Sequence, residues 1–309
     1  MNTRDSQQES RSLQRPAMPR FSRGAGAGAP TPGRVSTDPK VRHYYDAYDE
    51  WGRLAAPAGQ FEFSRTMYLL NQHLPANSRV LDLGGGPGRY AIALARRNHR
   101  VVLADISPVQ LDTAKRKIRA TELPAALESI DEVDATDLHR YSDESFDAVI
   151  ALGPFYHLTT EQQRITAAAE IARVTRPGGL VYVAFMPPLV GVTGLIDRVV
   201  ADEQQVAPDA YQKALVEGRF ENRTNRGFQA GWYGRPEQVE AVFGDAGYER
   251  LDLVSVRGIA YGREEAVLKL RATHPDQFAG IMQALQESAR DTSVIATCGH
   301  VLYIGKKRE

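Results

Sequence analysis

The chain has 309 residues, of which 42% are hydrophobic and 25% charged, so a core can form without disulfides or bound metal. Basic and acidic residues balance at 38 each, which excludes a global field that attracts nucleic acid or acidic membranes. The single cysteine, Cys298, excludes an internal disulfide and a cysteine-rich zinc site, and it suits a cytoplasmic setting. No apolar run approaches about 18 residues, so we expect no membrane span. The N-terminus has no apolar h-region, so we expect no secretory signal.

Residues 1–38 are expected to form a disordered tail. The segment is polar and becomes low-complexity at Arg23-Gly24-Ala25-Gly26-Ala27-Gly28-Ala29-Pro30. Such a composition buries too little apolar area to offset the entropy lost on ordering. We therefore assign the folded domain to residues 39–309.

Two segments at the start of the domain are expected to form helices that cover the site, within residues 41–75. An aromatic cluster at residues 43–51 lies between acidic residues. Residues 61–74 then place Phe63, Met67 and Leu70 at helical spacing, and a proline follows.

Strands and helices alternate through the middle of the chain. This rhythm predicts a parallel α/β sheet with helices on both faces. The expected strands cover residues 79–83, 101–105, 127–133, 146–152 and 180–185, and the expected helices cover residues 89–97, 109–120 and 160–174, the last stopped by Pro177-Gly178-Gly179.

After Phe185 the rhythm breaks, and residues 187–234 are expected to form an inserted lid with helices at 195–204 and 209–217. The alternation resumes with a helix at 235–243 and strands at 250–256 and 300–304, separated by a helix at 275–288. Aromatic and arginine side chains in and beside the insertion suit either an aromatic or anionic substrate or ordinary packing. They are Phe220, Arg223, Arg226, Phe228, Trp232, Tyr233 and Arg235.

The turn after the first expected strand is rich in glycine. Asp82 and Leu83 precede glycines at 84, 85, 86 and 88, and a helix follows. Such a turn lets the backbone approach a ligand closely and points helix N–H groups at it. The G-x-G-x-G spacing, with Arg89 where a dinucleotide site has glycine, disfavours a pyrophosphate. The Asp82 carboxylate suits an ammonium group instead.

Two further acids follow later strands. Asp105 ends the second strand about twenty residues after the loop, where a carboxylate can bind both hydroxyls of a ribose. Asp134 follows the third strand and can accept a hydrogen bond from an adenine amine, while the backbone of Ala135 reaches a ring nitrogen. The alternatives are a helix cap for Asp105, although Ser107 already fills that position, and a solvated loop acid for Asp134.

Four ordered motifs resemble those of class I S-adenosylmethionine-dependent methyltransferases. They are Val80-Leu81-Asp82-Leu83-Gly84-Gly85-Gly86-Pro87-Gly88-Arg89-Tyr90, the acid Asp105, the strand Phe146-Asp147-Ala148-Val149-Ile150-Ala151-Leu152, and the turn Arg173-Val174-Thr175-Arg176-Pro177-Gly178-Gly179-Leu180. The resemblance covers most of residues 41–309. With Gly153-Pro154-Phe155-Tyr156-His157-Leu158, the glycine motif resembles a bacterial small-molecule methyltransferase-like group whose substrates are mostly unassigned.

This resemblance implies a Rossmann-like, doubly wound sheet of seven strands with the last strand antiparallel. It implies S-adenosylmethionine as cofactor and SN2 transfer of its methyl group to oxygen or nitrogen, with no metal. The implied cofactor site comprises Asp82, Gly84, Gly85, Gly86, Gly88, Asp105, Ile106, Asp134, Ala135 and Leu152.

Side chains outside these motifs complete the hypothesis. Tyr45 is expected to close over the methionine part of the cofactor, and Arg65 to pair with its carboxylate. His157 is the candidate base and Tyr156 a second candidate, because both follow the fourth strand beside the expected methyl group. The alternatives are core packing for Tyr45, an exposed helix face for Arg65, and a helix cap for His157.

Three rival functions stay open from the sequence. They are a nicotinamide-dependent oxidoreductase on a similar sheet, an aminopropyl transferase, and a non-catalytic cofactor-binding protein. We expect a small-molecule substrate and no nucleic-acid partner, because the chain is neutral and Gly153-Pro154-Phe155-Tyr156 replaces the motif of nucleic-acid amino-methyltransferases.

Overall fold

The computed structural model describes residues 36–121, 127–202, 205–222 and 230–309. In these residues a seven-stranded sheet has the strand order β3-β2-β1-β4-β5-β9-β8. Every pair of neighbours is parallel except the two that include β9, which runs antiparallel to β5 and β8. The predicted doubly wound sheet with a reversed last strand is confirmed. The strands are β1 (Arg79–Leu83), β2 (Arg100–Asp105), β3 (Leu127–Glu132), β4 (Phe146–Ala151), β5 (Thr175–Phe185), β8 (Tyr248–Ser255) and β9 (Val301–Lys307).

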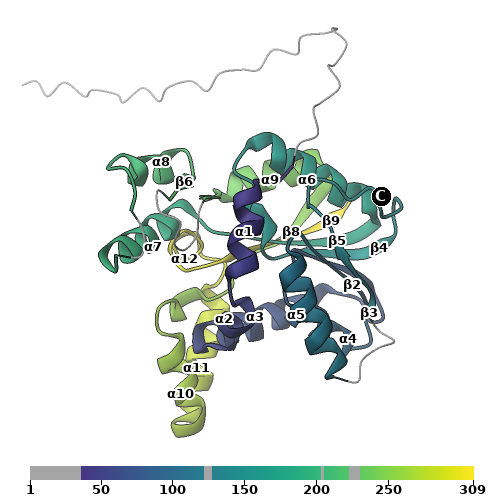
Figure 1. Ribbon diagram of the computed structural model, residues 1–309. Coiled ribbons are helices and arrows are strands. Elements are labelled where there is room, and N and C mark those ends of the chain that lie inside the picture. Colours follow the sequence, from purple (N-terminus) through teal and green to yellow (C-terminus); the bar gives the residue numbers. More distant parts are fainter. Residues whose placement is uncertain (1–35, 122–126, 203–204, 223–229) are drawn as a thin grey trace, which may run out of the picture. The chain divides into compact units, whose positions relative to one another are not determined.

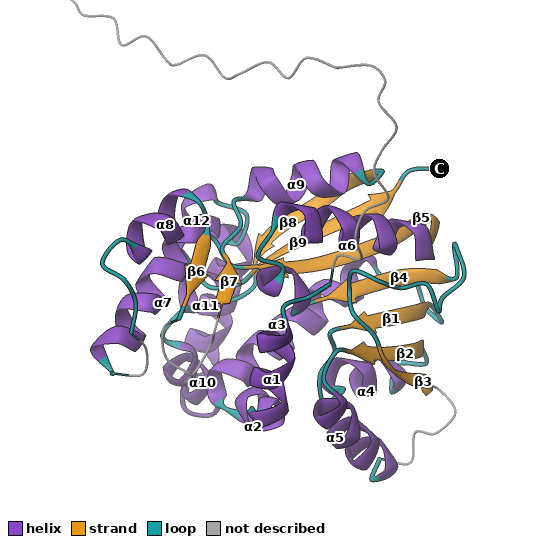
Figure 2. Ribbon diagram, turned by 45° about the horizontal axis from the view of Figure 1, so that its top comes forward, coloured by secondary structure: helices purple, strands orange, loops and turns teal. Residues whose placement is uncertain are grey.

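Helices cover both faces of the sheet (Figures 1 and 2). Alternate residues of β1 point to opposite faces, so Leu81 packs in one core and Val80 in the other. Both faces are buried, which explains the nearly continuous apolar runs of the central strands. The first core receives α6 (Glu161–Val174) and α9 (Pro236–Asp245), and the second receives α3 (Pro57–His73), α4 (Arg89–Ala95) and α5 (Pro108–Arg119).

The start of β5 differs from the sequence prediction. Helix α6 begins after Thr160, whose side chain forms a capping box with Gln163, and it ends at Val174. The expected turn at 177–179 lies inside β5, because Thr175 already pairs with Phe146. The register shifts before Ala148, and Gly178 takes a φ of 70°. The turn is therefore an irregularity within the strand.

Three helices precede β1. They are α1 (Pro39–Ala47), α2 (Glu50–Ala55) and α3, which begins four residues before the expected start at Phe61. Asp38 caps α1 and accepts a hydrogen bond from the backbone N–H of Lys40. Of the expected tail at residues 1–38, only the last three residues are described.

The segment at 187–234 folds around a small apolar cluster of its own, with Leu195, Ala214, Phe220 and Tyr233 buried in it. It contains α7 (Pro188–Val200), α8 (Ala210–Val216), β6 (Arg219–Glu221) and β7 (Ala230–Trp232), and the two strands pair antiparallel. Trp232, like Phe220 and Tyr233, is almost fully buried, so these aromatic residues serve packing. Arg235 donates to the Leu215 carbonyl, whereas Arg223, Arg226 and Phe228 lie outside the described residues.

After β8 the chain forms a helical hairpin, α10 (Glu264–Thr273) and α11 (Pro275–Ser288), of which only α11 was predicted. Both helices pack against α3 through Phe61, Val267 and Leu285, and the hairpin lies beside α2 and α3 in Figure 1. Shorter elements are α12 (Thr292–Thr297) and the 3-10 turns η1 (Pro154–His157) and η2 (Gly258–Ala260). No helix in the described parts of the chain is long and apolar enough to cross a membrane.

Candidate functional site

The glycine loop after β1 lies at the carboxyl edge of the sheet. The Gly84 N–H donates to the Ala104 carbonyl at 2.7 Å, which ties the loop to the end of β2. Gly84 has a φ of 68°, and a Cβ there would lie 2.5 Å from Cγ of Pro154. Gly86 has a φ of 55°, but a Cβ there would meet only Glu50, at 3.7 Å. The loop is therefore packed on one side and faces open space on the other.

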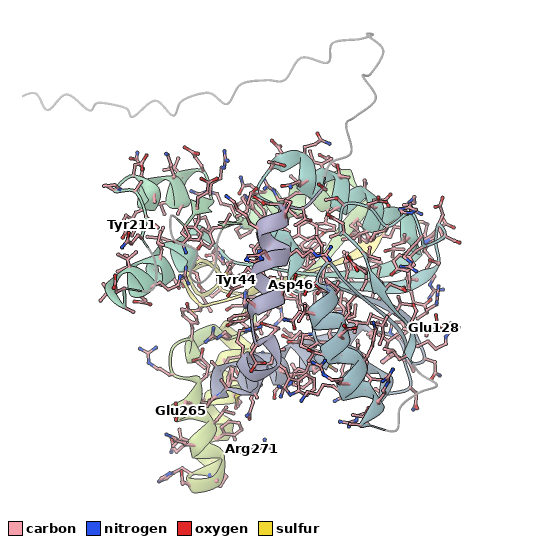
Figure 3. The ribbon with its side chains drawn as sticks, viewed as in Figure 1. Tyr44, Asp46, Glu128, Tyr211, Glu265 and Arg271 are labelled. Carbon is pink, nitrogen blue, oxygen red and sulfur yellow. The ribbon has the colours of Figure 1, made fainter. Side chains whose placement is uncertain are left out.

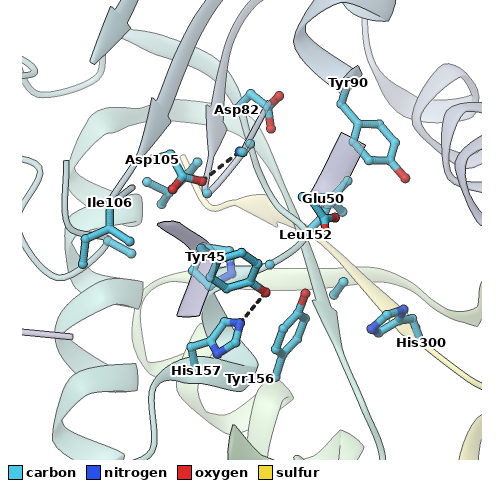
Figure 4. A pocket seen from close by; sticks show the side chains of 18 of the residues that line it. Tyr45, Glu50, Asp82, Tyr90, Asp105, Ile106, Leu152, Tyr156, His157 and His300 are labelled. Carbon is cyan, nitrogen blue, oxygen red and sulfur yellow. Dashed lines mark hydrogen bonds between the residues drawn. The ribbon is translucent and has the colours of Figure 1, made fainter. Parts of the chain in front are cut away.

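A cavity occupies that open space, lined by residues at the ends of β2 and β3 on one side and of β4 and β5 on the other. This is where strand order reverses, the usual ligand position in such sheets. Figure 4 shows side chains that line the cavity. Eleven of the fourteen predicted site residues line it: Tyr45, Asp82, Gly84, Gly85, Gly86, Asp105, Ile106, Ala135, Leu152, Tyr156 and His157.

Asp82 brings a buried carboxylate to the cavity. It is 2% exposed, and its Oδ2 atom has no hydrogen-bond partner in the described chain. Burial raises the pKa of Asp82 to about 7, with a further contribution from the nearby Asp105. A buried acceptor without a donor is unfavourable, so this atom is suited to a cationic group of a ligand.

Asp105 accepts a hydrogen bond from the glycine loop and lines the same cavity. One carboxylate oxygen accepts from the Gly86 N–H at 2.8 Å, and the other accepts from the Ser107 N–H at 2.9 Å. Ser107, not Asp105, caps α5, since its hydroxyl accepts from the Gln110 N–H. Burial raises the pKa of Asp105 to about 6, although these two bonds oppose the shift. The remaining lone pairs of the Asp105 carboxylate can accept hydrogen bonds from hydroxyl groups.

Asp134 does not line the cavity. Its carboxylate accepts hydrogen bonds from the backbone and hydroxyl groups of Thr37 and Thr136, at 2.8 to 2.9 Å. It thereby fastens the chain before α1 to the loop after β3. The adenine contact predicted for this side chain is not supported, while its neighbours Val133 and Ala135 do line the cavity.

Helix α1 covers the cavity and is fixed to α5. The Gln110 side chain donates to the carbonyls of Tyr45 and Tyr48, both at 2.7 Å. The Ser107 hydroxyl donates to Asp46 at 2.6 Å. These bonds hold the Tyr45 ring over the cavity, where Figure 4 shows its hydroxyl directed at His157.

The Tyr45 hydroxyl lies 2.8 Å from Nε2 of His157, in an edge-to-face ring pair. His157 belongs to η1 and is 5% exposed, and burial lowers its pKa to about 3. It is therefore neutral at pH 7 and a weak base. It does not cap α6, because Thr160 does.

A second histidine, missed in the sequence, lies farther along the cavity. Nδ1 of His300 lies 3.0 Å from the Glu62 carboxylate, and the His300 ring stacks on Tyr156. Burial raises the pKa of Glu62, but His300, Arg53 and Arg257 outweigh that effect and lower it to about 2. Glu62 and His300 are 238 residues apart in sequence, so no local pattern joins them.

Helix α2 contributes a charged pair that the sequence analysis also missed. Arg53 donates to both carboxylate oxygens of Glu50, and both residues line the cavity. Acid and base three residues apart on a helix are a recognisable pair, so this signal was present in the sequence.

Besides Asp134, two predicted site residues lie elsewhere. Arg65 is on the face of α3 that packs toward α10 and α11, and its guanidinium donates to Gln286 at 2.9 Å. The prediction that Arg65 pairs with the cofactor carboxylate is therefore corrected. Gly88 is the N-cap of α4 with a φ of 81°, and it packs against Leu103 and Ala114 instead of the cavity.

Comparison with known proteins agrees with this geometry. Residues 80–179 match the family model described as a methyltransferase domain. This domain belongs to the class I S-adenosylmethionine-dependent methyltransferases. S-adenosylmethionine is accordingly its cofactor, and the alternative of a nicotinamide-dependent oxidoreductase is set aside.

Two curated proteins similar to this domain are methyltransferases that carry different names. The methyltransferase GfsG of Streptomyces halstedii is 31% identical over 182 residues, which are 59% of this chain and 56% of that protein. The tRNA 5-carboxymethoxyuridine methyltransferase of Escherichia coli K12 is 30% identical over 113 residues, 36% of this chain and 41% of that protein. The chain thus spans about half the length of the curated relatives it matches.

Solved methyltransferase structures share the fold. The crystal structure of a SAM-dependent methyltransferase from Methanosarcina mazei superposes with a TM-score of 0.54 at 16% identity. The match covers 78% of this chain and 97% of that chain.

Proposed function

We propose that the protein transfers a methyl group from S-adenosylmethionine to an oxygen or nitrogen atom of a small molecule. One observation carries this proposal: the cavity continues from the glycine loop past Leu152 to the Glu62–His300 pair, beneath α1 and α2. A cavity covered in this way suits an acceptor that enters it whole. A nucleic-acid acceptor, which one relative's name suggests for that relative, would need an open and basic surface.

The cofactor assignments follow from charge and position. The unpartnered oxygen of Asp82 is suited to the ammonium group, and Asp105 to the ribose hydroxyls. Gly84, Gly85 and Gly86 give the backbone close access. Adenine then lies against the apolar side chains at the ends of β2 and β3, which are Ile106, Val133 and Ala135.

Arg53 is our candidate partner for the cofactor carboxylate, in place of Arg65. It lines the cavity, and its pairing with Glu50 fixes its guanidinium there. Tyr45 lies over the same region and presents an aromatic ring to the cationic sulfur.

With adenosine toward β2 and β3, the acceptor lies toward β4, β5 and β9, against Leu152, Ala184 and Leu302. When bound, the cofactor supplies a methyl group made electrophilic by its sulfonium. The protein contributes alignment and the exclusion of water. An acceptor hydroxyl must also lose its proton, so a base is needed at this end of the cavity.

His300 is the better base of the two histidines. Ionised Glu62 favours the proton on Nδ1 and leaves the Nε2 lone pair of His300 to accept one from the acceptor. His157 instead holds the Tyr45 hydroxyl, and its low pKa disfavours a base role. We therefore propose that His157 positions Tyr45 and that Tyr156, stacked on His300, orients the acceptor.

Two measurements test the function. Titration calorimetry should detect S-adenosylhomocysteine binding and no NADH binding. Incubation with methyl-labelled cofactor, in parallel with a metabolite extract and with bulk tRNA, should label a small molecule and leave the tRNA unlabelled. Label found only on tRNA would overturn the proposed acceptor class, and loss of all label despite cofactor binding would favour a non-catalytic role.

A further inference from the structure

A second cavity lies outside the methyltransferase site, between α3 and the hairpin α10–α11. Its walls include four apolar side chains, Phe61, Leu268, Phe278 and Met282. Two cationic side chains join them, Arg65 from α3 and Arg271 from α10, the latter labelled in Figure 3. No carboxylate lines this cavity in the described chain. The lining thus combines an apolar surface with uncompensated positive charge.

Arg65 is the unusual member of this lining. Arg65 is only 5% exposed, and its Nε atom has no hydrogen-bond partner among the described residues. One guanidinium nitrogen donates to Gln286, a neutral acceptor, and the group lies 5.0 Å above the ring of Tyr68. Neither contact supplies the negative charge that a buried guanidinium requires.

The surroundings of Arg65 increase this need. Burial lowers its pKa, and the neighbouring Arg290 adds charge of the same sign. Arg290 already has a partner, since it donates to both carboxylate oxygens of Asp252. The Asp252 carboxylate is therefore already paired with Arg290. None of the ion pairs found in the described chain includes Arg65, whose guanidinium donates to Gln286.

We propose that this cavity binds a small organic acid, with one carboxylate on Arg65 and an apolar body against Phe61, Leu268, Phe278 and Met282. A guanidinium is matched to a carboxylate because its planar N–H groups bind two oxygens together. A single carboxylate balances the one buried charge, while exposed Arg271 remains at the rim in solvent. The inference does not depend on the methyl-transfer reaction.

The two cavities share helix α3. Residues 61, 65 and 68 face the organic-acid cavity, whereas Glu62 and Thr66 line the cofactor cavity. This follows from helical periodicity, which places residues three and four apart on one face. A ligand on Arg65 therefore contacts the same helix that carries Glu62.

Octanoate is the probe for this site, and octan-1-ol is its neutral counterpart. Calorimetric titration uses the full chain saturated with S-adenosylhomocysteine, so that the cofactor cavity is filled. Arg65→Met keeps the apolar stem and removes the charge. Lys269→Gln is the matched control, because Lys269 is exposed on the same hairpin and pairs with Glu265 at 2.8 Å.

We expect octanoate to bind the wild-type protein at least tenfold more tightly than octan-1-ol. Arg65→Met should weaken octanoate binding at least tenfold, and Lys269→Gln should leave it within twofold. Equal octanoate affinity in wild type and Arg65→Met, or no preference for the acid over the alcohol, would overturn the proposal. If Arg65→Met does not fold, Leu268→Trp provides the second variant, since it fills the cavity with Arg65 intact and should abolish binding.

Discussion

The two ends of the methyltransferase cavity are built in different ways. The cofactor end comes from the termini of consecutive strands, with Asp82, Asp105 and Ala135 within one continuous stretch of chain. The proposed acceptor end joins Glu62 of α3, Tyr156 of η1 and His300 before β9. Local sequence motifs define the cofactor end, whereas the residues of the proposed acceptor end come together only when the chain folds. Variants at the two ends should therefore separate cofactor binding from turnover.

The largest effect is expected at the cofactor end. Asp105→Ala removes the carboxylate that we propose accepts two ribose hydroxyls, and with it the observed acceptor of the Gly86 N–H. Charge-assisted hydrogen bonds contribute about 1.5–3 kcal/mol each, so affinity for S-adenosylhomocysteine should fall by roughly 100-fold or more. Calorimetry measures this loss. Asp134→Asn is the matched acid control and should change affinity much less, and normal binding by Asp105→Ala would refute the ribose assignment.

At the acceptor end, His300→Gln should lower the turnover number by about 100-fold, the usual effect of losing a general base. Affinity for S-adenosylhomocysteine should stay within twofold of wild type. Glu62→Gln should also lower the turnover number, because it removes the charge that orients His300. Initial rates with the identified acceptor, measured across pH, give the test. A variant with full turnover would exclude His300 as the base.

Cofactor affinity should depend on pH through Asp82. Its raised pKa of about 7 means that the carboxyl is about half protonated at neutral pH without ligand. An ammonium ligand favours the ionised form, so binding releases a proton, and affinity should rise about tenfold from pH 6 to pH 8. Calorimetry in two buffers of different ionisation enthalpy counts the released proton. Asp82→Asn should remove most of this pH dependence and leave the smaller part that Asp105 contributes through its pKa of about 6. A full tenfold change in the Asp82→Asn variant would assign the effect to another group.

The smallest effect is expected for the hydrogen bond between Tyr45 and His157. Tyr45→Phe removes the hydroxyl that lies 2.8 Å from Nε2 of His157, and with it this buried hydrogen bond. The free energy of unfolding should fall by about 1–2 kcal/mol, measured by urea denaturation. Tyr68→Phe, at a tyrosine that is 44% exposed, should change it by less than about 0.5 kcal/mol. Equal stability of the two variants would mean that the Tyr45–His157 bond contributes nothing.

Sequence patterns predicted the sheet well because each strand carries its own periodicity and each helix its own end signals. Ser107-Pro108 opens α5, and Thr160 caps α6 as the residue types suggest. The helix α10 was missed, since its apolar positions form a face only against α3 and α11. The strand β5 was predicted too short, because Thr175 joins the sheet through its partner Phe146 and not through a local pattern.

The sequence alone determined the cofactor class, because a glycine loop, a following helix and acids at strand ends are local features with fixed spacing. The tertiary structure decided which arginine faces which cavity. Arg65 and Arg53 both precede the loop as basic helix residues, and only packing against α10 and α11 directs Arg65 away from the site. It also decided the candidate base, since the Glu62–His300 pair exists only when α3 and the start of β9 meet. Contacts between distant segments depend on the whole fold, and no spacing along the chain encodes them.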